Sequence, residues 1–326
     1  MFSVMQKNAP RIAIVVPCYN EQEVLPMSNK TLSDLLSDMI TGGLISDNSY
    51  ILYVDDGSRD NTWRIIESII AGNSHAEGIK LAANAGHQNA LIAGLETAAD
   101  HCDAAISIDA DLQDDILAIP RMVEKFREGY EIVYGVRNSR ESDSWFKRES
   151  AQGFYRIMRH LGVKSVYNHA DFRLMSAAAL KDFLQYDERN MFIRGIIPGL
   201  GRTQTSVYYD RKPRTAGESK YPLKKMINFA VDGITSFSVR PVRMVFFFGI
   251  GFLLVALGIF IYVMTRYFEG ETIEGWTSLM LSIWFCTGVI LMSLGVIGEY
   301  IGKIYTEVKH RPRYSIEKST ITQREK

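Results

Sequence analysis

Two uncharged apolar stretches, residues 244–265 and 276–298, constrain this chain more than any other feature of its sequence. At about 1.5 Å of rise per residue, a helix over either stretch extends roughly 33–35 Å and crosses a hydrocarbon core of about 30 Å. Buried helices of a globular protein are the alternative, but these rarely run so far without a polar face. The sequence therefore predicts two transmembrane helices.

The charges around these stretches predict their orientation. Basic residues lie before the first stretch and after the second: Lys224, Lys225, Arg240, Arg243, Lys303, Lys309, Arg311 and Arg313. The loop between the stretches holds Arg266 together with three glutamates. Because positively charged flanks stay in the cytoplasm, we expect a multi-pass protein of the cytoplasmic (inner) membrane, with residues 1–243 and both termini on the cytoplasmic side.

Composition excludes several classes of protein. The chain has 37 Lys+Arg and 37 Asp+Glu, so its net charge is zero, whereas a nucleic-acid binder normally carries a basic excess. Apolar residues make up 47% of the chain, which is too many for a disordered protein. Its 3 cysteines lie far apart, so neither a disulfide framework nor a zinc knuckle is expected.

Short β-branched segments alternate with amphipathic ones before the first apolar stretch. Strands are predicted at 11–17, 50–54, 78–82, 104–109 and 131–136, and helices at about 21–40, after a capping Asp60, at 87–99 and at 116–128. This alternation is typical of an α/β fold with a mostly parallel sheet and helices on both faces. Ligands of such folds bind at the carboxyl ends of the strands.

Polar clusters follow four of the predicted strands, at residues 18–21, 55–58, 84–87 and 109–111. Neither G-x-G-x-x-G nor a P-loop is present, so a dinucleotide site and a Walker-type site are not expected. Asp109 and Asp111 are separated by one residue after an apolar strand, an arrangement that can direct two carboxylates at one hard cation. Mg²⁺ is commonly held by one or two carboxylates together with substrate phosphates. A solvated turn is the alternative interpretation of such a pair.

Seven motifs occur together in this chain. They are P-C-Y-N-E (17–21), D-D-G-S-R-D (55–60), N-A-G-H (84–87), D-A-D-L-Q (109–113), A-D-F-R-L-M-S (170–176), G-E-S-K-Y (217–221) and G-E-Y-I-G-K-I-Y (298–305). In this combination the chain resembles the family 2 glycosyltransferases, and among them the polyprenyl-phosphate glycosyltransferases. The two-span bactoprenol (undecaprenyl phosphate) glucosyltransferases of O-antigen and lipopolysaccharide modification are the most similar subgroup. The resemblance covers nearly the whole chain and implies a GT-A fold, whose sheet is Rossmann-like and mostly parallel.

Together, the resemblance and the hydropathy predict four parts. These are a cytoplasmic GT-A domain (1–222), an interfacial amphipathic segment (223–243), the two transmembrane helices (244–298) and a basic cytoplasmic tail (299–326). A second amphipathic segment at about 154–161 is also expected to lie at the membrane surface. Packing in a protein core is the alternative for both amphipathic segments.

The resemblance implies an inverting, metal-dependent transfer of a hexose to undecaprenyl phosphate, with glucose from UDP-glucose as the leading expectation. The implied partners are a UDP-sugar, a polyprenyl phosphate and the lipid bilayer, without nucleic acid, and a homo-oligomer is compatible with the resemblance. Other donors remain open, among them UDP-aminoarabinose, a UDP-N-acetylhexosamine and GDP-mannose. A non-catalytic membrane scaffold with the same fold also remains open.

The resemblance further assigns roles to individual residues. The nucleotide-binding residues are Pro17, Tyr19, Asn20, Glu21, Asp55, Asp56, Asn84, Gly86 and Ala110, and the residues for Mg²⁺ or Mn²⁺ are Asp109, Asp111 and Gln113. Asp171 takes the position of the catalytic carboxylate. A phosphate monoester, with a second pKa of about 6, is mostly dianionic at neutral pH, so we expect Asp171 to align substrates, with proton abstraction as the second reading. An ion pair with Arg173 is the structural alternative.

Arginines are expected to bind the acceptor phosphate, because the planar guanidinium makes paired, charge-assisted hydrogen bonds. The candidates are Arg137, Arg140 and Arg148, with ordinary surface charge as the alternative. Arg214 and Lys220 are predicted in a loop that closes over the donor. The chain departs from the family where D-P-P is usual, because it has Asp114, Asp115 and Ile116, which leaves open which carboxylates would bind the metal.

Overall fold

The computed structural model describes residues 9–138, 169–189, 191, 193–210, 240–269 and 275–321. Residues 9–210 and 311–321 of this part form one compact unit, and residues 240–310 belong to a second. The predicted amphipathic segment at 154–161 and most of the one at 223–243 lie outside the described residues.

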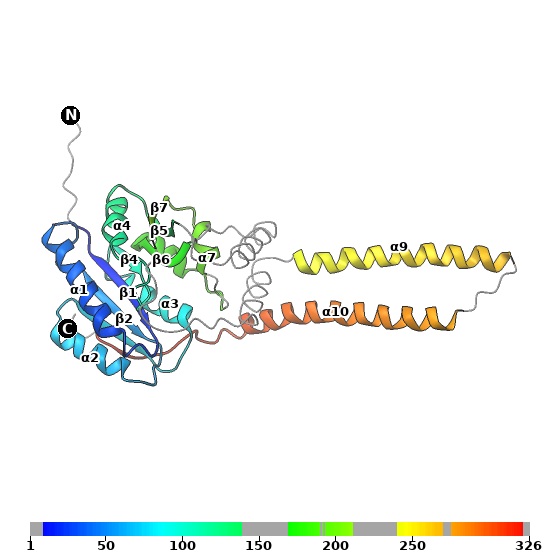
Figure 1. Ribbon diagram of the computed structural model, residues 1–326, viewed down its shortest axis with the longest axis horizontal. Coiled ribbons are helices and arrows are strands. Elements are labelled where there is room, and N and C mark those ends of the chain that lie inside the picture. The colour runs from blue at the N-terminus through cyan, green and yellow to red at the C-terminus, as the bar shows by residue number, and fades with distance from the viewer. Residues whose placement is uncertain are drawn as a thin grey trace, which may run out of the picture. The chain divides into compact units, whose positions relative to one another are not determined.

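The first unit is built on a sheet with the strand order β7-β5-β6-β4-β1-β2-β3-β8 (Figure 1). The strands are β1 (Ile12–Cys18), β2 (Tyr50–Asp55), β3 (Ala76–Leu81), β4 (Ala104–Ser107), β5 (Ile132–Arg137), β6 (His169–Ser176), β7 (Gln204–Tyr209) and β8 (Ile316–Ser319). The helices are α1 (Leu25–Thr41), α2 (Thr62–Gly72), α3 (His87–Ala98), α4 (Ala118–Arg127), α6 (Ala177–Leu184) and α7 (Ile193–Ile196), followed by a 3₁₀ turn at Ile197–Gly199.

The five predicted strands correspond to β1–β5 and the four predicted helices to α1–α4, with ends that differ by a few residues. Every residue of β1 and β2 is buried, as the continuous apolar runs of these strands indicate for a sheet covered on both faces. The expected cap of α2 is displaced by one residue: Asn61 is the N-cap, but the Asp60 carboxylate accepts the backbone N–H of Thr62 at 3.0 Å. The side chain of Asp60 therefore still serves the first turn of the helix.

The expected mostly parallel arrangement is confirmed for β1 with β2 and β4, for β2 with β3, and for β5 with β7. Three pairings are antiparallel, because β6 inserts between β4 and β5, and β8 adds to the edge of β3. The segment that forms β6 contains the motif A-D-F-R-L-M-S, and no strand was predicted there. The architecture is GT-A-like, and the antiparallel β6 brings the beginning of that strand to the carboxyl end of β4.

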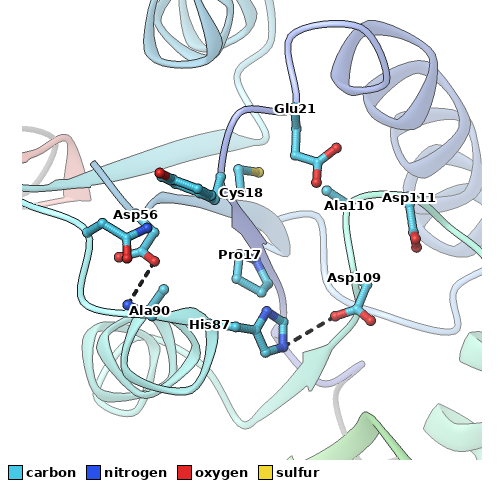
Figure 2. A pocket seen from close by; sticks show the side chains of 12 residues that line it. Pro17, Cys18, Glu21, Asp56, His87, Ala90, Asp109, Ala110 and Asp111 are labelled. Atoms are coloured by element: carbon cyan, nitrogen blue, oxygen red, sulfur yellow. Dashed lines mark hydrogen bonds and ion pairs between the residues drawn. The ribbon is translucent and has the colours of Figure 1, made fainter. Parts of the chain in front are cut away.

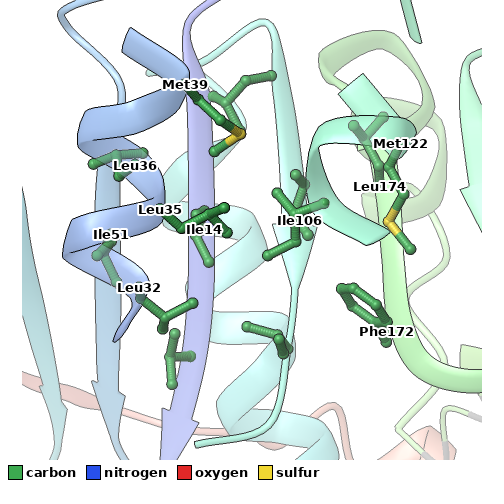
Figure 3. Packing of buried hydrophobic residues seen from close by; sticks show 14 of the residues in the cluster. Ile14, Leu32, Leu35, Leu36, Met39, Ile51, Ile106, Met122, Phe172 and Leu174 are labelled. Carbon is green, nitrogen blue, oxygen red and sulfur yellow. The ribbon is translucent and has the colours of Figure 1, made fainter. Parts of the chain in front are cut away.

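Helices cover both faces of the central strands. On one face, Leu32, Leu36 and Met39 of α1 belong to the same buried cluster as Ile14 of β1 and Ile51 of β2 (Figure 3). On the other face α3 approaches so closely that a Cβ atom on Gly94 would lie 2.4 Å from the Val15 side chain. This close packing holds the beginning of α3 against the ends of β1 and β2, where the polar clusters lie.

The second unit contains two long helices, α9 (Arg240–Phe268) and α10 (Trp276–Val308) (Figure 1). They contact each other through the rings of Phe252 and Phe285. By length and composition, two segments of these helices are able to cross a membrane, Val245–Arg266 and Phe285–Val308. Both predicted apolar stretches therefore lie in helices, although the second candidate span extends further toward the C-terminus than predicted.

The predicted tail, residues 299–326, is divided in the structure. Its first part continues α10 to Val308, whereas β8 pairs antiparallel with β3 and Ala82 donates its N–H to the Ser315 carbonyl at 2.8 Å. The unpaired backbone groups of an edge strand readily accept a further strand, which gives the pairing its physical reason. The chain thus returns, after α10, to the same sheet that it left before α9.

Candidate active site

A pocket of about 430 Å³ lies at the carboxyl ends of β1, β2 and β4 (Figure 2). Its lining residues are Pro17, Cys18, Tyr19, Glu21, Asp56, Asn84, Gly86, His87, Ala90, Asp109, Ala110 and Asp111. Nine of them were predicted as site residues. Three of the predicted nucleotide- or metal-binding residues, Asn20, Asp55 and Gln113, do not line it but contact the loops that do.

Asp109 and Asp111 lie on the turn that follows β4, and Glu21 lies on the same side of the pocket (Figure 2). The turn is anchored to α1, because Ser28 of that helix donates a hydrogen bond from its hydroxyl to the Ala110 carbonyl at 2.6 Å. Burial raises the pKa of Asp109 to about 6, with neighbouring carboxylates adding to the rise and His87 opposing it. Burial and the charges of Asp111 and Asp109 likewise raise the pKa of Glu21.

This concentration of carboxylates fits a divalent cation. In the described part of the chain no three His, Cys, Asp or Glu side chains are arranged to hold a metal by themselves. A site with two carboxylates is nevertheless usual for Mg²⁺, which completes its ligands with water and substrate phosphate. Asp109 and Asp111 are the pair with the right chemistry, and a cation between them would relieve the carboxylate repulsion that adds to the raised pKa of Asp109.

The other polar side chains of the turn have partners within the fold. The Gln113 amide donates to Asp111 at 2.6 Å, so this side chain orients a candidate ligand. Asp114 is buried and accepts hydrogen bonds from Tyr209 at 2.7 Å and Arg137 at 2.9 Å. Asp115 accepts the backbone N–H of Leu117. The two extra acids of this turn therefore serve structural contacts, whereas a metal-binding role of Gln113 stays a prediction.

Asp171 lies at the beginning of β6, beside the acidic turn. Its carboxylate contacts Arg173 at 2.6 Å and Arg194 through two bonds of 3.1 and 3.0 Å. His87 approaches within 3.9 Å of Asp171 and 3.5 Å of Asp109. Burial alone would raise the pKa of Asp171, but the two guanidinium groups outweigh burial and hold this pKa well below its ordinary value. The anticipated ion pair with Arg173 is present, and Asp171 is a poor proton acceptor.

The loops after β1, β2 and β3 are tied together beneath the predicted nucleotide site. The Asp56 carboxylate accepts the N–H groups of Ala85 at 2.7 Å and Gly86 at 3.0 Å. Gly57 has a φ of +63°, and a Cβ atom there would lie 2.6 Å from the backbone of Asn84, so only glycine fits. Tyr19 remains 42% exposed at the pocket. These contacts give the pocket a rim of tightly bonded backbone, with one exposed aromatic ring beside it.

Asn20 and Asp55 shape the same loops from outside the pocket. Asn20, at a φ of 55°, donates its N–H to Ser58 at 3.0 Å and accepts from the N–H of Arg59 at 2.9 Å. Asp55 is fully buried and accepts the N–H of Ser58. Their predicted direct contact with nucleotide stays a prediction, and the structure gives both residues a supporting role.

The predicted phosphate-binding arginines are only partly within the structure. Arg137 donates hydrogen bonds from Nε and Nη2 to Asp114, at 3.2 and 2.9 Å. These bonds direct its guanidinium at a buried carboxylate. Arg140, Arg148, Arg214 and Lys220 lie outside the described residues. Their predicted roles remain predictions.

The placement of two basic side chains, His87 and Arg194, was not predicted from the sequence. His87 belongs to a quoted motif but was interpreted only as the residue that opens a helix, which it also does. Arg194 lies in the short α7, outside every motif. No local signal identifies Arg194, because only the tertiary fold brings α7 to the beginning of β6.

Comparison with known proteins gives two family matches. The glycosyl transferase family 2 profile matches residues 13–184, and the profile of the GtrB C-terminal hairpin matches residues 240–304. The uncharacterized glycosyltransferase YkoT of Bacillus subtilis is 51% identical, over 96% of this chain and 93% of that protein. The bactoprenol glucosyl transferase of Shigella phage SfII is 38% identical, over 95% of this chain and 98% of that protein.

Proposed function

Because the chain belongs to glycosyl transferase family 2 and is a glycosyltransferase, we propose that it transfers a hexose from a nucleoside diphosphate sugar to a membrane-bound polyprenyl phosphate. Glucose from UDP-glucose and undecaprenyl phosphate are the proposed substrates. The likeness to the phage bactoprenol glucosyl transferase carries the proposal, because it spans both the pocket-bearing domain and the C-terminal hairpin.

The pocket supports a nucleoside diphosphate sugar as donor. Tyr19 offers an exposed ring on which a base can stack, and the backbone rim around Gly86 is open to a ribose or diphosphate. Asp109 and Asp111 would hold a divalent cation, which would neutralise the charge that develops on the departing diphosphate. Without such a cation, the carboxylates that line this pocket would repel the donor.

The proposed reaction is a single displacement. An oxygen of the acceptor phosphate attacks the anomeric carbon and forms a new carbon–oxygen bond, while the bond from that carbon to the diphosphate breaks. UDP leaves with the electron pair, and an α-linked donor gives a β-linked product. A dianionic phosphate has no proton to lose, so the low pKa of Asp171 is compatible with a role in alignment.

The connectivity supports a hairpin whose two ends are on the same side of a membrane. β8 follows α10 and pairs with β3, while β1–β7 precede α9, so the chain crosses an even number of times between them. The basic residues that flank both spans favour the cytoplasmic side for the catalytic unit. Undecaprenyl phosphate could then present its phosphate there while its tail stays in hydrocarbon.

Purified full-length protein in detergent tests the proposal directly. UDP should be released only when UDP-glucose, undecaprenyl phosphate and Mn²⁺ are all present, and undecaprenol, which lacks the phosphate, serves as the matched control lipid. Release of UDP at the same rate with either lipid would contradict the proposed acceptor. A donor panel with UDP-N-acetylglucosamine, UDP-aminoarabinose and GDP-mannose tests the proposed sugar, which is wrong if another donor reacts faster.

A further inference from the structure

An anionic acceptor meets an electrostatic obstacle at this pocket. Glu21, Asp56, Asp109 and Asp111 all line it, and the donor adds a diphosphate. A phosphate monoester that carries almost two negative charges needs a cation on its own side of the sugar, beyond the metal that serves the donor. The described residues near the pocket offer few such cations.

Arg173 is poorly suited to this task, whereas Arg137 is already a phosphate-binding candidate from the sequence. Arg173 is only 1% exposed, so no lipid headgroup can reach its guanidinium. Arg137 directs two of its nitrogen atoms at the buried Asp114, whose other partner is Tyr209.

Arg194 is differently placed. Its side chain is 35% exposed, and it contacts Asp171 through Nε and Nη2, which lie on one edge of the guanidinium plane. Asp171 is in turn 3.9 Å from His87, a residue that lines the pocket next to Asp109.

The charges of this cluster sum to a cation. Asp171 contributes one negative charge, whereas Arg173 and Arg194 contribute two positive ones, so the trio carries a net charge of about +1. The buried Arg173 neutralises the negative charge of Asp171 from inside the fold. Asp171 in addition holds the guanidinium of Arg194 through two hydrogen bonds. Such a contact orders a long side chain in advance of binding, which lowers the entropic cost of gripping a phosphate.

We infer that Arg194 binds the phosphate of the lipid acceptor and that Asp171 positions it for this contact. The inference rests on the proposed transfer to a polyprenyl phosphate. It gives Asp171 a role as the anchor of a phosphate-binding arginine, and it places the acceptor phosphate beside His87 and the acidic turn, where the anomeric carbon of the donor would lie.

Steady-state kinetics of full-length Arg194→Gln and Arg194→Lys test the inference, with UDP-glucose saturating and undecaprenyl phosphate varied. Loss of a hydrogen bond to a charged group corresponds to about a tenfold to hundredfold effect. Arg194→Gln should raise the KM for undecaprenyl phosphate by about this factor, and Arg194→Lys should fall between it and the unsubstituted protein. Binding of UDP with Mn²⁺, measured by calorimetry, should change less than about twofold.

Arg202→Gln is the matched control. Arg202 is 32% exposed and also makes two bonds to carboxylate oxygens, but its partners Asp182 and Glu131 lie outside the site described above. Its KM for the lipid should stay within about twofold of the unsubstituted protein. An equal rise in both glutamine variants would assign the effect to general loss of structure and overturn the inference, as would an unchanged KM in Arg194→Gln.

Inhibition by short prenyl compounds gives a second measurement that needs no turnover by a damaged variant. Farnesyl phosphate should displace the lipid from the unsubstituted protein more strongly than farnesol, and Arg194→Lys should show a smaller preference. An undiminished preference would contradict the role of Arg194. If the unsubstituted protein instead shows no transfer to undecaprenyl phosphate, the proposed function itself fails, and this outcome is distinct from a normal enzyme in which Arg194 is dispensable.

Discussion

Ser28 and Ala110, which are 82 residues apart in the chain, are joined by a hydrogen bond of 2.6 Å from the serine hydroxyl to the alanine carbonyl. The bond is buried, and it connects α1 to the turn that carries Asp109 and Asp111. The geometry of the acidic pair therefore depends on a small polar residue that shows no sign of function in its own segment.

Ser28→Ala should destabilise the protein and weaken its site together. The substitution leaves a buried carbonyl without its donor, at a cost of about 1–3 kcal/mol in the free energy of unfolding. Binding of UDP with Mn²⁺ should weaken several-fold, because the turn loses its support, and calorimetry with thermal unfolding measures both effects. Ser37→Ala on the same helix is the control, since Ser37 is exposed and bonds only within α1. Equal behaviour of the two variants would exclude a supporting role for Ser28.

Asp111→Asn should abolish most of the metal-dependent binding of UDP. Residues that merely support a metal ligand change metal affinity by about 10–100-fold, so a ligand should reach at least the lower value. Asp115→Asn tests the neighbouring acid, which accepts the N–H of Leu117 and keeps this ability as an amide. Calorimetric titration of UDP with and without Mn²⁺ should find Asp115→Asn near normal. A greater loss of metal-dependent UDP binding in Asp115→Asn than in Asp111→Asn would indicate that Asp115 is the metal ligand instead.

Binding of Mn²⁺ without nucleotide should depend on pH through Asp109. The pKa of this carboxyl is raised to about 6 in the metal-free protein, and only its deprotonated form can bind a cation. Affinity should thus be nearly constant above pH 7 and fall by about tenfold for each pH unit below 6. Electron paramagnetic resonance of free Mn²⁺ from pH 5 to 8 measures this, and equal affinities at pH 5 and 7.5 would contradict it.

Ile321→Ala should destabilise the catalytic unit, although the residue lies beyond both candidate membrane spans. Ile321 is 8% exposed and follows Thr320, whose N–H bonds Gly78 of β3. Loss of a buried isoleucine side chain costs about 2–5 kcal/mol, and each kcal/mol lowers Tm by roughly 2–4 °C in a unit of this size.

Ile316→Ala in the same C-terminal segment is the control, because Ile316 is 42% exposed. Its effect on the free energy of unfolding should stay below about 1 kcal/mol. Similar shifts of Tm in the two variants, measured by thermal unfolding in detergent, would show that the buried contact of Ile321 contributes nothing specific.

Much of the catalytic unit could be predicted because local patterns dominate there. The apolar runs that form β1 and β2 are buried on both faces of the sheet. Because the two strands are parallel, the residues that follow them lie at the same edge of the sheet. The acidic pair after β4 was predicted for the same reason. The two apolar stretches that lie in α9 and α10 could be predicted as helices as well, since few structures other than a membrane-spanning helix accommodate so long a run of uncharged residues.

The pairing of β6, the return of β8 and the position of Arg194 could not be predicted in this way. β6 carries alternating polar and apolar residues in a motif, but nothing local says that it enters antiparallel between β4 and β5. Nine of the twelve residues that line the pocket were predicted by motif, whereas the two-point contact between Asp171 and Arg194 joins positions that no shared motif connects.

By itself the amino-acid sequence determined the alternating elements, the acidic pair, the two apolar helices and the family, because each depends on residues that are neighbours in the chain or recur at a short period. Only the tertiary structure decided that Arg194 joins Arg173 at Asp171, which side chain holds the Ala110 carbonyl and where the C-terminal segment pairs. These contacts depend on strand order and on close packing between distant segments, and their energy is realised only when the whole sheet has formed.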